Sequence, residues 1–378
     1  MKYYIIAGEA SGDLHGSNLI KELHKIDAAA NIRCWGGEKM QAAGATLVKD
    51  YKDLAFMGFT EVIKNLPTIF RNLSFCKKDI LAFAPDVLVL IDYPGFNLRI
   101  AKWAKQQGLK IVYYISPQIW AWKENRIHNI KRSVDKMLVI LPFEKDFYKK
   151  WEYDVEYVGH PLVEVIEEYS SQWSMVNSQM AEDELKKDDS KVIALLPGSR
   201  KQEILKKLPI MLSVAKHFAD YKFIVAKAPG LPDEFYEELL KPYDNVESVS
   251  DKTYALLSRS TAALVTSGTA TLETALFAVP EIICYKGNPA SYQIAKRLIK
   301  IKYIGLVNLI MDKPVVKELI QNELTEENLV AELTLLLHDE NKKQQLAKDY
   351  AELKTLLSAG GHASSNAAKS IYHFINKN

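Results

Sequence analysis

The sequence predicts an α/β protein made of two Rossmann-like domains that face one cleft. Short apolar runs alternate with helical patterns, which is typical of parallel sheets with helices on both faces. A length of 378 residues also exceeds what one hydrophobic core normally holds. We therefore predict an N-terminal domain over 1–165, a polar linker over 166–190 and a C-terminal domain over 191–361, with a final helix at about 362–378 that can pack back on the first domain.

The expected elements follow from apolar runs and helical spacing. In the first half the strands are Tyr3–Ala7, Ile32–Trp35, Val87–Ile91, Ile111–Ile115, Met137–Leu141 and Val155–Val158, with helices such as Leu14–Ile26 and Leu98–Gln107 between them. In the second half the strands are Val192–Leu196, Phe223–Ala226, Ala262–Val265 and Ile282–Tyr285, and the tail from Glu327 is helical. Ligands of such sheets gather at the carboxyl ends of the strands, so the residues that follow each strand are the first site candidates.

Composition argues against several classes of protein. The chain has 49 Lys and Arg against 47 Asp and Glu, so nothing in its charge favours nucleic-acid binding, and none is expected. Its three cysteines are far apart, which fits a reducing cytoplasm and supplies no metal-binding pattern. The first apolar run is too short for a signal peptide, and no apolar run approaches the roughly 18 residues that span a membrane. We expect a soluble or peripheral protein without a bound metal.

The segment 266–273 predicts a buried strand, a tight turn and a helix. Ser267, Gly268 and Thr269 would leave backbone N–H groups free at the start of the helix, where the helix dipole favours an anion such as a diphosphate. Glu273, about a turn and a half further on, could reach a sugar hydroxyl beside that phosphate. The alternative is an ordinary helix start capped by Ser267 or Thr269.

A second turn of this type follows the predicted strand Val192–Leu196. Gly198 allows the backbone to approach a ligand closely. Ser199 can cap the next helix and offer a hydroxyl, and Arg200 can hold a phosphate through its planar guanidinium. Taken alone, Arg200 could equally be a surface residue beside a helix cap. Two such turns in one half of the chain predict a nucleotide-diphosphate site.

The first strand ends in the turn Gly8–Asp13, which is not a dinucleotide-binding fingerprint because a leucine replaces the third glycine. Glu9 lies at the carboxyl end of the strand and is expected to face the cleft, where a carboxylate suits a sugar hydroxyl or an amine. Ser11 and Asp13 are further candidates for substrate contact. The alternative is that they cap the following helix, and we expect this of Asp13 in any case.

Asp92 has the same placement, directly after the strand Val87–Ile91. Partial burial there would raise its pKa and make it suitable as a general base. The alternative is a residue that stabilises its loop. Asn97 is expected to cap the helix that begins at Leu98.

These segments resemble those of the lipid-A-disaccharide synthase family. The motifs occur in the family's order over nearly the whole chain: Gly8–Asp13, Ile91–Asn97, Ser116–Trp122, Leu141–Glu144, Gly159–Pro161, Pro197–Arg200, Ser267–Glu273 and Leu306–Leu309. The resemblance implies an inverting glycosyltransferase of GT-B architecture. Such an enzyme transfers 2,3-diacylglucosamine from UDP-2,3-diacylglucosamine to the 6-hydroxyl of 2,3-diacylglucosamine 1-phosphate (lipid X), giving lipid A disaccharide 1-phosphate and UDP. No cofactor and no metal are implied.

The resemblance also assigns roles to individual residues. Asp92 matches the family's essential aspartate and is the expected base, with Glu9 as the reserve candidate. Asn308 matches a family asparagine that is important for activity. Many members have a second aspartate where this chain has Gly95, so that carboxylate cannot act here. The residues that match the nucleotide-side motifs, for diphosphate and ribose, are Ser199, Arg200 and Glu273.

Acylated substrates raise the question of membrane contact. Apolar residues at helical spacing with Lys and Arg between them suit a membrane interface, although such a stripe is also typical of an ordinary core. The residues expected to contact the membrane or the acyl chains are Met57, Phe59, Ile63, Leu66, Ile69 and Phe70. The basic stretch 123–150 is a candidate contact for anionic headgroups or for the acceptor phosphate. The alternative is that most of its charges simply form a solvated surface. Trp120 and Trp122 could line an acyl pocket, and we favour the core for both.

The resemblance places the protein in the cytoplasm, peripherally bound to the inner membrane of a Gram-negative cell, and makes a homodimer possible. Two other functions stay open. One is another UDP-sugar enzyme on the same fold, such as an epimerase or the transferase of peptidoglycan synthesis, whose first turn should be richer in glycine than Gly8–Asp13. The other is a non-catalytic nucleotide-sugar-binding protein at the membrane, which would need neither Asp92 nor Glu9.

Overall fold

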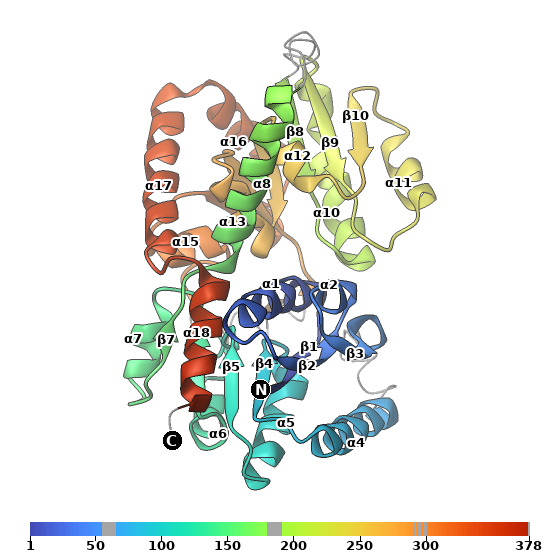
Figure 1. The fold of residues 1–378 in the computed structure, drawn as a ribbon. Helices are drawn as coiled ribbons and strands as arrows, with labels where there is room; N and C mark the ends of the chain where they lie inside the picture. Colours follow the sequence, from blue (N-terminus) through green and yellow to red (C-terminus); the bar gives the residue numbers. More distant parts are fainter. Residues whose placement is uncertain (55–65, 180–190, 290–291, 294–296, 298–300, 377–378) are drawn as a thin grey trace. The chain divides into compact units, whose positions relative to one another are not determined.

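The computed structural model describes residues 1–54, 66–179, 191–289, 292–293, 297 and 301–376. It divides into two compact units (Figure 1). Unit 1 consists of Met1–Pro161 and Leu357–Asn378, and unit 2 of Leu162–Leu356. Each unit contains one sheet whose paired strands are parallel, with helices packed on it. The prediction of two parallel-sheet α/β domains is therefore confirmed.

The sheet of unit 1 has seven strands in the order β3-β2-β1-β4-β5-β6-β7. Its strands are β1 (Lys2–Ala7), β2 (Asn31–Gly36), β3 (Thr46–Asp50), β4 (Val87–Ile91), β5 (Ile111–Tyr114), β6 (Lys136–Val139) and β7 (Glu156–Tyr157). The order reverses between β1 and β4, which pair with Ala7 opposite Ile91. The segments that follow these two strands therefore leave the sheet side by side, at the point where ligands of such sheets bind.

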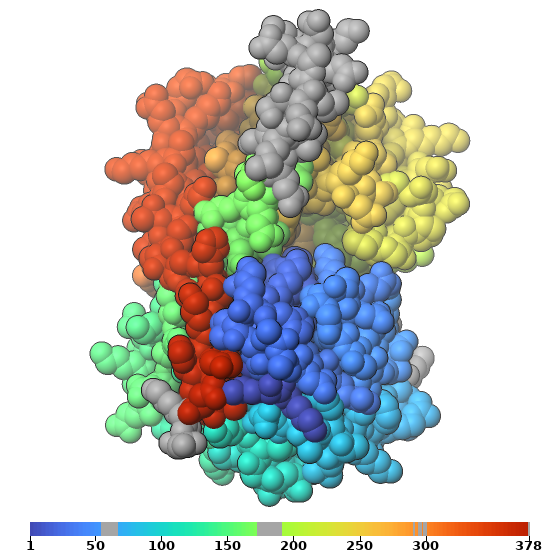
Figure 2. All heavy atoms as spheres, viewed as in Figure 1, coloured from blue at the N-terminus to red at the C-terminus, as the bar shows by residue number. Residues whose placement is uncertain are grey.

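Alternate residues of β1 belong to the two faces of this sheet, as the period of a strand requires. Tyr3 and Ile5 pack with residues of α1 and α18, whereas Tyr4 and Ile6 pack with residues of α4, α5 and α6. The helices of unit 1 are α1 (Ala10–Ile26), α2 (Glu38–Ala42), α4 (Leu66–Phe83), α5 (Pro94–Gln106), α6 (Ile127–Ser133), α7 (Glu144–Lys149) and α18 (Ala363–Asn376). Figure 2 shows the side chains of α18, in red, against those of α1, in blue. The C-terminal helix thus completes one face of unit 1.

The sheet of unit 2 has six strands in the order β10-β9-β8-β11-β12-β13. Its strands are β8 (Lys191–Leu196), β9 (Tyr221–Ala226), β10 (Val246–Val249), β11 (Ser260–Thr266), β12 (Glu281–Tyr285) and β13 (Lys317–Ile320). Here the order reverses between β8 and β11, which pair with Leu196 opposite Val265. The turns after β8 and β11 are thus neighbours in the same way as those after β1 and β4.

The helices of unit 2 include one that occupies part of the expected linker. They are α8 (Pro161–Gln179), α10 (Lys201–Ser213), α11 (Asp233–Leu240), α12 (Thr253–Leu257), α13 (Thr269–Leu276), α15 (Leu306–Met311), α16 (Glu326–His338) and α17 (Glu340–Ser358). On α8, the ring of Tyr169 packs against those of Tyr254 and Phe277. Of the polar stretch 166–190, the part up to Gln179 is helical, and 180–190 lies outside the described residues.

Candidate active site

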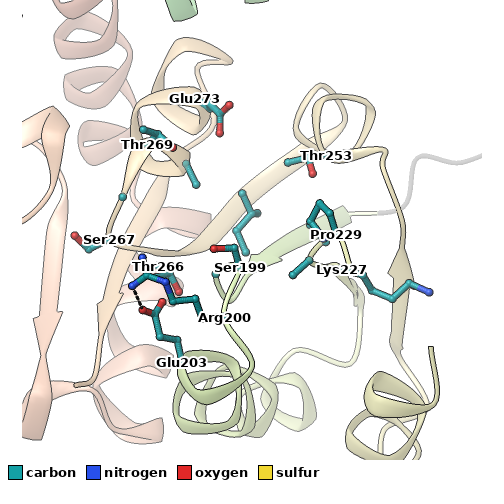
Figure 3. A pocket seen from close by; sticks show the side chains of 16 residues that line it. Ser199, Arg200, Glu203, Lys227, Pro229, Thr253, Thr266, Ser267, Thr269 and Glu273 are labelled. Atoms are coloured by element: carbon teal, nitrogen blue, oxygen red, sulfur yellow. Dashed lines mark hydrogen bonds and ion pairs between the residues drawn. The ribbon is translucent and has the colours of Figure 1, made fainter. Parts of the chain in front are cut away.

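All seven residues expected to bind a nucleotide line one pocket of unit 2. The pocket has a volume of about 360 Å³, and the turns after β8 and β11 form its centre (Figure 3). The seven residues are Gly198, Ser199, Arg200, Ser267, Gly268, Thr269 and Glu273. They meet because β8 and β11 are adjacent where the strand order reverses.

The start of α13 in this pocket carries no side-chain cap. Gly268 occupies the N-cap position with a φ of 157°, which favours glycine, and no side chain accepts a hydrogen bond from the first turn. Ser267 instead donates its hydroxyl to the carbonyl of Ile304 at 2.9 Å. Capping by Ser267 or Thr269, the alternative considered above, is therefore wrong. The first N–H groups of α13 are left for an anion.

The start of α10 is built in the same way but carries charge. Arg200 is its N-cap residue, and no side chain caps the helix, so the expected cap by Ser199 is also wrong. Arg200 Nη1 lies 3.2 Å from Glu203 Oε1, and Lys207 Nζ lies 3.4 Å from Glu203 Oε2 (Figure 3 shows the first pair). Burial lowers the pKa of Lys207, while Glu203 raises it. Two cations and one carboxylate thus gather beside a pocket suited to a phosphate.

Glu273 faces the same pocket from α13. Its Oε1 accepts a hydrogen bond from the Tyr254 hydroxyl at 2.8 Å. Burial raises the pKa of Glu273, and this bond lowers it. Because the bond occupies one oxygen, the other is available to accept from a sugar hydroxyl.

Sequence reasoning missed several residues of this pocket, among them Thr266, Lys227 and Thr253. The hydroxyl of Thr266 is buried and has no hydrogen-bond partner within the described residues. Lys227 extends away from Arg200 in Figure 3 and pairs with Asp233 at 2.6 Å. Thr266 ends β11 and Lys227 follows β9. Applying the strand-end rule to every strand would have found both.

Unit 1 brings Glu9 and Asp92 together by the same topology. They follow β1 and β4, and the ring of Tyr93 lies directly on Gly8. A Cβ added to Gly8 would be 2.3 Å from that ring, so only glycine allows this contact. The two expected catalytic carboxylates therefore belong to one site of unit 1.

The backbone at Asp92 is strained and firmly held. Asp92 and Tyr93 both have left-handed backbone conformations, with φ of 42° and 48°. The Asp92 carbonyl accepts hydrogen bonds from Asn97 Nδ2 at 2.8 Å and from the Tyr113 hydroxyl at 2.5 Å, and its N–H donates to the carbonyl of Tyr114 at 3.2 Å. Strain maintained in this way is typical of functional sites.

Asn97 holds this loop from inside α5, which begins at Pro94 with Tyr93 as its N-cap residue. The expectation that Asn97 caps a helix beginning at Leu98 is therefore wrong. Its amide reaches back to the carbonyls of Ile91 and Asp92. A residue expected to start a helix instead fixes the position of the candidate base.

The carboxyl group of Asp92 titrates near neutral pH. Burial raises its pKa, the charge of Glu9 raises it further, and the sum brings it from 3.8 to about 7. A group with such a pKa can both take up and release a proton under physiological conditions. Asp92 thus has the property expected of a general base.

Asp13 and Ser11 differ in how accessible their side chains are to a substrate. The buried carboxylate of Asp13 accepts from the backbone N–H groups of Gly37, Lys39 and Met40 at 2.7, 3.2 and 3.1 Å. It therefore caps α2. We expected it to cap its own helix, α1, and that expectation is wrong. The oxygens of its carboxylate are occupied by these bonds. Ser11 is exposed in the first turn of α1. Of these two candidates, only Ser11 is accessible to a substrate.

Asn308 is buried in α15 of unit 2. Its Nδ2 donates to the Val316 carbonyl at 2.9 Å and to Glu318 Oε1 at 3.0 Å, and its Oδ1 accepts from the Val316 N–H at 2.9 Å. Both ends of the amide are thus engaged within the protein. The geometry favours a positioning role for this side chain.

A second pocket, of about 220 Å³, lies beside Asp92 in unit 1, where Trp122 and Arg126 also line it. The side chain of Trp122 is 45% exposed, so the expectation that it lies in the core is wrong. Trp120 is partly buried and donates its indole N–H to Glu144. The sequence signal for Trp122 was its place at the end of the motif Ser116–Trp122, and that for Arg126 was its place in the basic stretch 123–150.

The stripe expected to contact the membrane is described only in part. Met57, Phe59 and Ile63 lie outside the described residues, and nothing is described of the side chain of Leu66. On α4, Ile69 packs partly buried against the core, whereas Phe70 is 61% exposed. None of the described helices has the length and apolar character needed to cross a membrane. Nor do His, Cys, Asp and Glu side chains of the described residues form a group of three that could hold a metal ion.

The fold is shared with solved structures of sugar-nucleotide enzymes. The UDP-GlcNAc 2-epimerase of Neisseria meningitidis, solved with UDP-GlcNAc bound, matches with a TM-score of 0.69 and 15% identity over all of both chains. The glycotransferase of kitacinnamycin matches with a TM-score of 0.64 and 14% identity over 99% of each chain. The chain thus has the two-domain α/β fold found in GT-B glycosyltransferases and UDP-GlcNAc 2-epimerases.

Sequence comparison defines the family within this fold. A family model described as lipid-A-disaccharide synthetase matches residues 3–373. The lipid-A-disaccharide synthase of Geobacter metallireducens is 39% identical over 362 residues, which cover 94% of this chain and 93% of the relative. That of Coxiella burnetii (strain CbuG_Q212) is 36% identical over 375 residues, which cover 98% of each. The chain belongs to the lipid-A-disaccharide synthase family.

Proposed function

We propose that this chain is a lipid-A-disaccharide synthase, an inverting hexosyltransferase of lipid A biosynthesis. It transfers 2,3-diacylglucosamine from UDP-2,3-diacylglucosamine to the 6-hydroxyl of lipid X and releases UDP. Membership of the family over residues 3–373 supports the reaction. The observation that carries the mechanism is the environment of Asp92. Its backbone is strained, and its partly buried carboxyl group has a pKa of about 7 and lies beside a pocket. A non-catalytic binding protein would not need such a group.

In unit 1, Asp92 is the general base. Inversion requires one in-line displacement: the acceptor oxygen attacks the anomeric carbon, its bond to UDP breaks, and the hydroxyl proton passes to Asp92. Glu9 assists because its charge raises the pKa of Asp92 and makes the carboxylate a stronger base. Glu9 is also the reserve candidate for the base itself.

In unit 2, the pocket at α10 and α13 binds UDP. Its diphosphate would receive hydrogen bonds from the first N–H groups of α13 and from Arg200, which stabilise the charge that develops as the bond to the sugar breaks. Ser199 offers a further hydroxyl, and Glu273 would accept from the ribose. This scheme requires no cofactor and no metal ion.

We also propose that the protein binds peripherally to the cytoplasmic face of the inner membrane. On α4, Phe70 and Phe75 are 61% and 46% exposed, and exposed aromatic side chains on a helix that also carries Arg71, Lys77 and Lys78 suit a membrane interface. The variant Phe70→Ser with Phe75→Ser should bind less to sedimented phosphatidylglycerol vesicles than the wild type. Equal binding would contradict this surface. The homodimer stays a prediction that sedimentation velocity can check.

The decisive experiment is a transfer assay with UDP-2,3-diacylglucosamine and lipid X, read by mass spectrometry. The wild type should form disaccharide phosphate. Asp92→Ala should form none while keeping its fold and its protection from thermal unfolding by UDP. Binding of UDP by the wild type without any disaccharide would favour the binding protein, and isomerised UDP-sugar would favour an epimerase.

A further inference from the structure

Two cations, Lys123 and Arg126, lie against the ring of Trp122, a residue that lines the pocket containing Asp92. The ring of Trp122 has Lys123 Nζ at 4.2 Å and Arg126 Cζ at 5.6 Å from its centroid. Neither cation forms an ion pair with a carboxylate in the part of the chain that the structure describes. Arg126 also lines the pocket that contains Asp92. The ring of Trp122, which lines the pocket, therefore has two positive charges near it, one of them on the pocket-lining Arg126.

Other charges of the same basic stretch are used inside the protein. Lys131 donates to the carbonyl of Trp151, and Arg132 donates to the carbonyl of His128 and to Asn129. Lys123, by contrast, has a lowered pKa because of its partial burial and the nearby charge of Arg126. An anion bound between Lys123 and Arg126 would relieve this repulsion.

The hydroxyl of Tyr113 is influenced by both Arg126 and the candidate base. It donates to the backbone carbonyl of Asp92. Burial raises the pKa of Tyr113 most, the Asp92 charge raises it further, and Arg126 lowers it. Arg126 and Asp92 thus act on one hydroxyl, yet they form no ion pair, and Arg126 is not among the causes that set the pKa of Asp92. The two groups thus line one pocket without pairing with each other.

We infer that Arg126 and Lys123 bind the phosphate monoester of the acceptor sugar while Asp92 faces its 6-hydroxyl. The inference rests on the proposed function, which supplies an acceptor with these two groups. In glucosamine 1-phosphate the 6-hydroxyl and the 1-phosphate flank the ring oxygen, one sugar ring apart. The guanidinium of Arg126 can bind two phosphate oxygens at once, and Lys123 adds a point charge. The phosphate thereby selects the acceptor and turns its 6-hydroxyl towards Asp92.

The test compares acceptors with and without the phosphate. Binding of 2,3-diacylglucosamine 1-phosphate and of 2,3-diacylglucosamine is measured by titration calorimetry with the full chain in detergent micelles. The wild type should bind the phosphorylated acceptor more tightly. Arg126→Gln should weaken that binding about 10- to 100-fold and leave the unphosphorylated acceptor unchanged, because a hydrogen bond to a charged group is lost. Lys123→Gln should have a smaller effect in the same direction. Arg132→Gln, which removes a charge outside the pocket, should retain the wild-type preference.

Three results would overturn the inference. Arg126→Gln could keep the preference for the phosphorylated acceptor, or lose both acceptors equally, as a merely structural residue would. It could also lose only its binding to phosphatidylglycerol vesicles, which would assign the cations to lipid headgroups. The transfer assay on the same preparations separates this inference from the proposed function. If the wild type binds the phosphorylated acceptor through Arg126 but forms no disaccharide, the phosphate site is supported and the proposed transferase activity is contradicted.

Discussion

The carboxylates of Asp92 and Glu9 act on each other where β1 and β4 end side by side in unit 1. Burial is the main cause that raises the pKa of Asp92, and the charge of Glu9 is the second. Together they bring the pKa from 3.8 to about 7, close to the pH at which the chain would work. The charge of Glu9 thus raises the pKa of Asp92. Replacing each residue in turn can therefore distinguish the base from the residue that adjusts its pKa.

Replacing Glu9 by Gln should shift the pH dependence of transfer to lower pH. The acid limb of kcat/KM reports the ionisation of the base, and the variant removes one cause of its raised pKa while burial keeps it above 3.8. At high pH the rate should stay within about threefold of the wild type, because the ionised form of Asp92 is present in both. Glu38→Gln, an exposed carboxylate paired with Lys52, is the matched control. A loss of rate at every pH would instead make Glu9 the base.

Replacing Asp92 by Asn should abolish transfer and yet stabilise unit 1 at alkaline pH. Between about pH 4 and 7 the folded state keeps the Asp92 proton that the unfolded state has lost, so the free energy of unfolding of the wild type falls as the pH rises through this range. Asn carries no charge and tolerates a left-handed backbone. A shift from 3.8 to about 7 is roughly three pKa units, so the variant should gain about 3–4 kcal/mol over the wild type at pH 8 relative to pH 4.

Tryptophan fluorescence during urea unfolding can measure this difference. Five of the six tryptophans belong to unit 1, so the signal reports mainly on that unit: Trp35, Trp103, Trp120, Trp122 and Trp151. A difference in stability that does not change with pH would show that the carboxyl group of Asp92 is not perturbed.

Replacing Glu203 by Gln should tighten the binding of UDP. Glu203 is the partner of Arg200 in the nucleotide pocket, and a diphosphate would compete with it for the guanidinium. Because this pair is largely exposed, its removal should improve the dissociation constant only about two- to fivefold, measured by titration calorimetry. Glu238→Gln, on the exposed side of α11, is the control for the change in net charge. Weaker binding would mean that Glu203 orients Arg200 for the phosphate.

The sequence predicted the centres of both sheets better than their edges. The strands β3, β10 and β13 were not expected, and each is the last strand at an edge of its sheet. Their sequences, such as Thr46–Asp50 and Lys317–Ile320, mix charged and apolar residues because an edge strand has one neighbour and is only partly covered. The central strands are buried on both faces and therefore read as continuous apolar runs.

The nucleotide residues could be predicted because their signal is local. A strand, a glycine turn and a helix follow one another within a few residues around Gly198 and Gly268. The roles of Asp13 and Asn97 depend instead on segments that the fold brings near. Asp13 caps α2, which begins 25 positions further along the chain, and Asn97 turns back to the end of β4. No local spacing reveals such partners.

Asn308 belongs to a chain of hydrogen bonds that ends at the nucleotide turn. Glu318 accepts from Asn308 Nδ2 and from the backbone N–H groups of Ile304 and Gly305. The carbonyl of Ile304 in turn accepts from the hydroxyl of Ser267, which lines the nucleotide pocket. Asn308 can therefore influence the pocket without touching a ligand.

Replacing Asn308 by Ala should lower both stability and UDP affinity. The variant leaves the Val316 N–H without its buried partner, which should cost about 1–3 kcal/mol. Asn308→Asp should be worse, because it loses the Nδ2 donors and places a second carboxylate against Glu318. Thermal unfolding with and without UDP measures both effects, and Asn328→Ala, at an exposed position of α16, is the control. If Asn308 instead contacted the substrate directly, Asn308→Ala would unfold like the wild type and lose only kcat/KM. A loss of stability together with UDP affinity would explain why a buried amide, fully engaged within the protein, matters for activity.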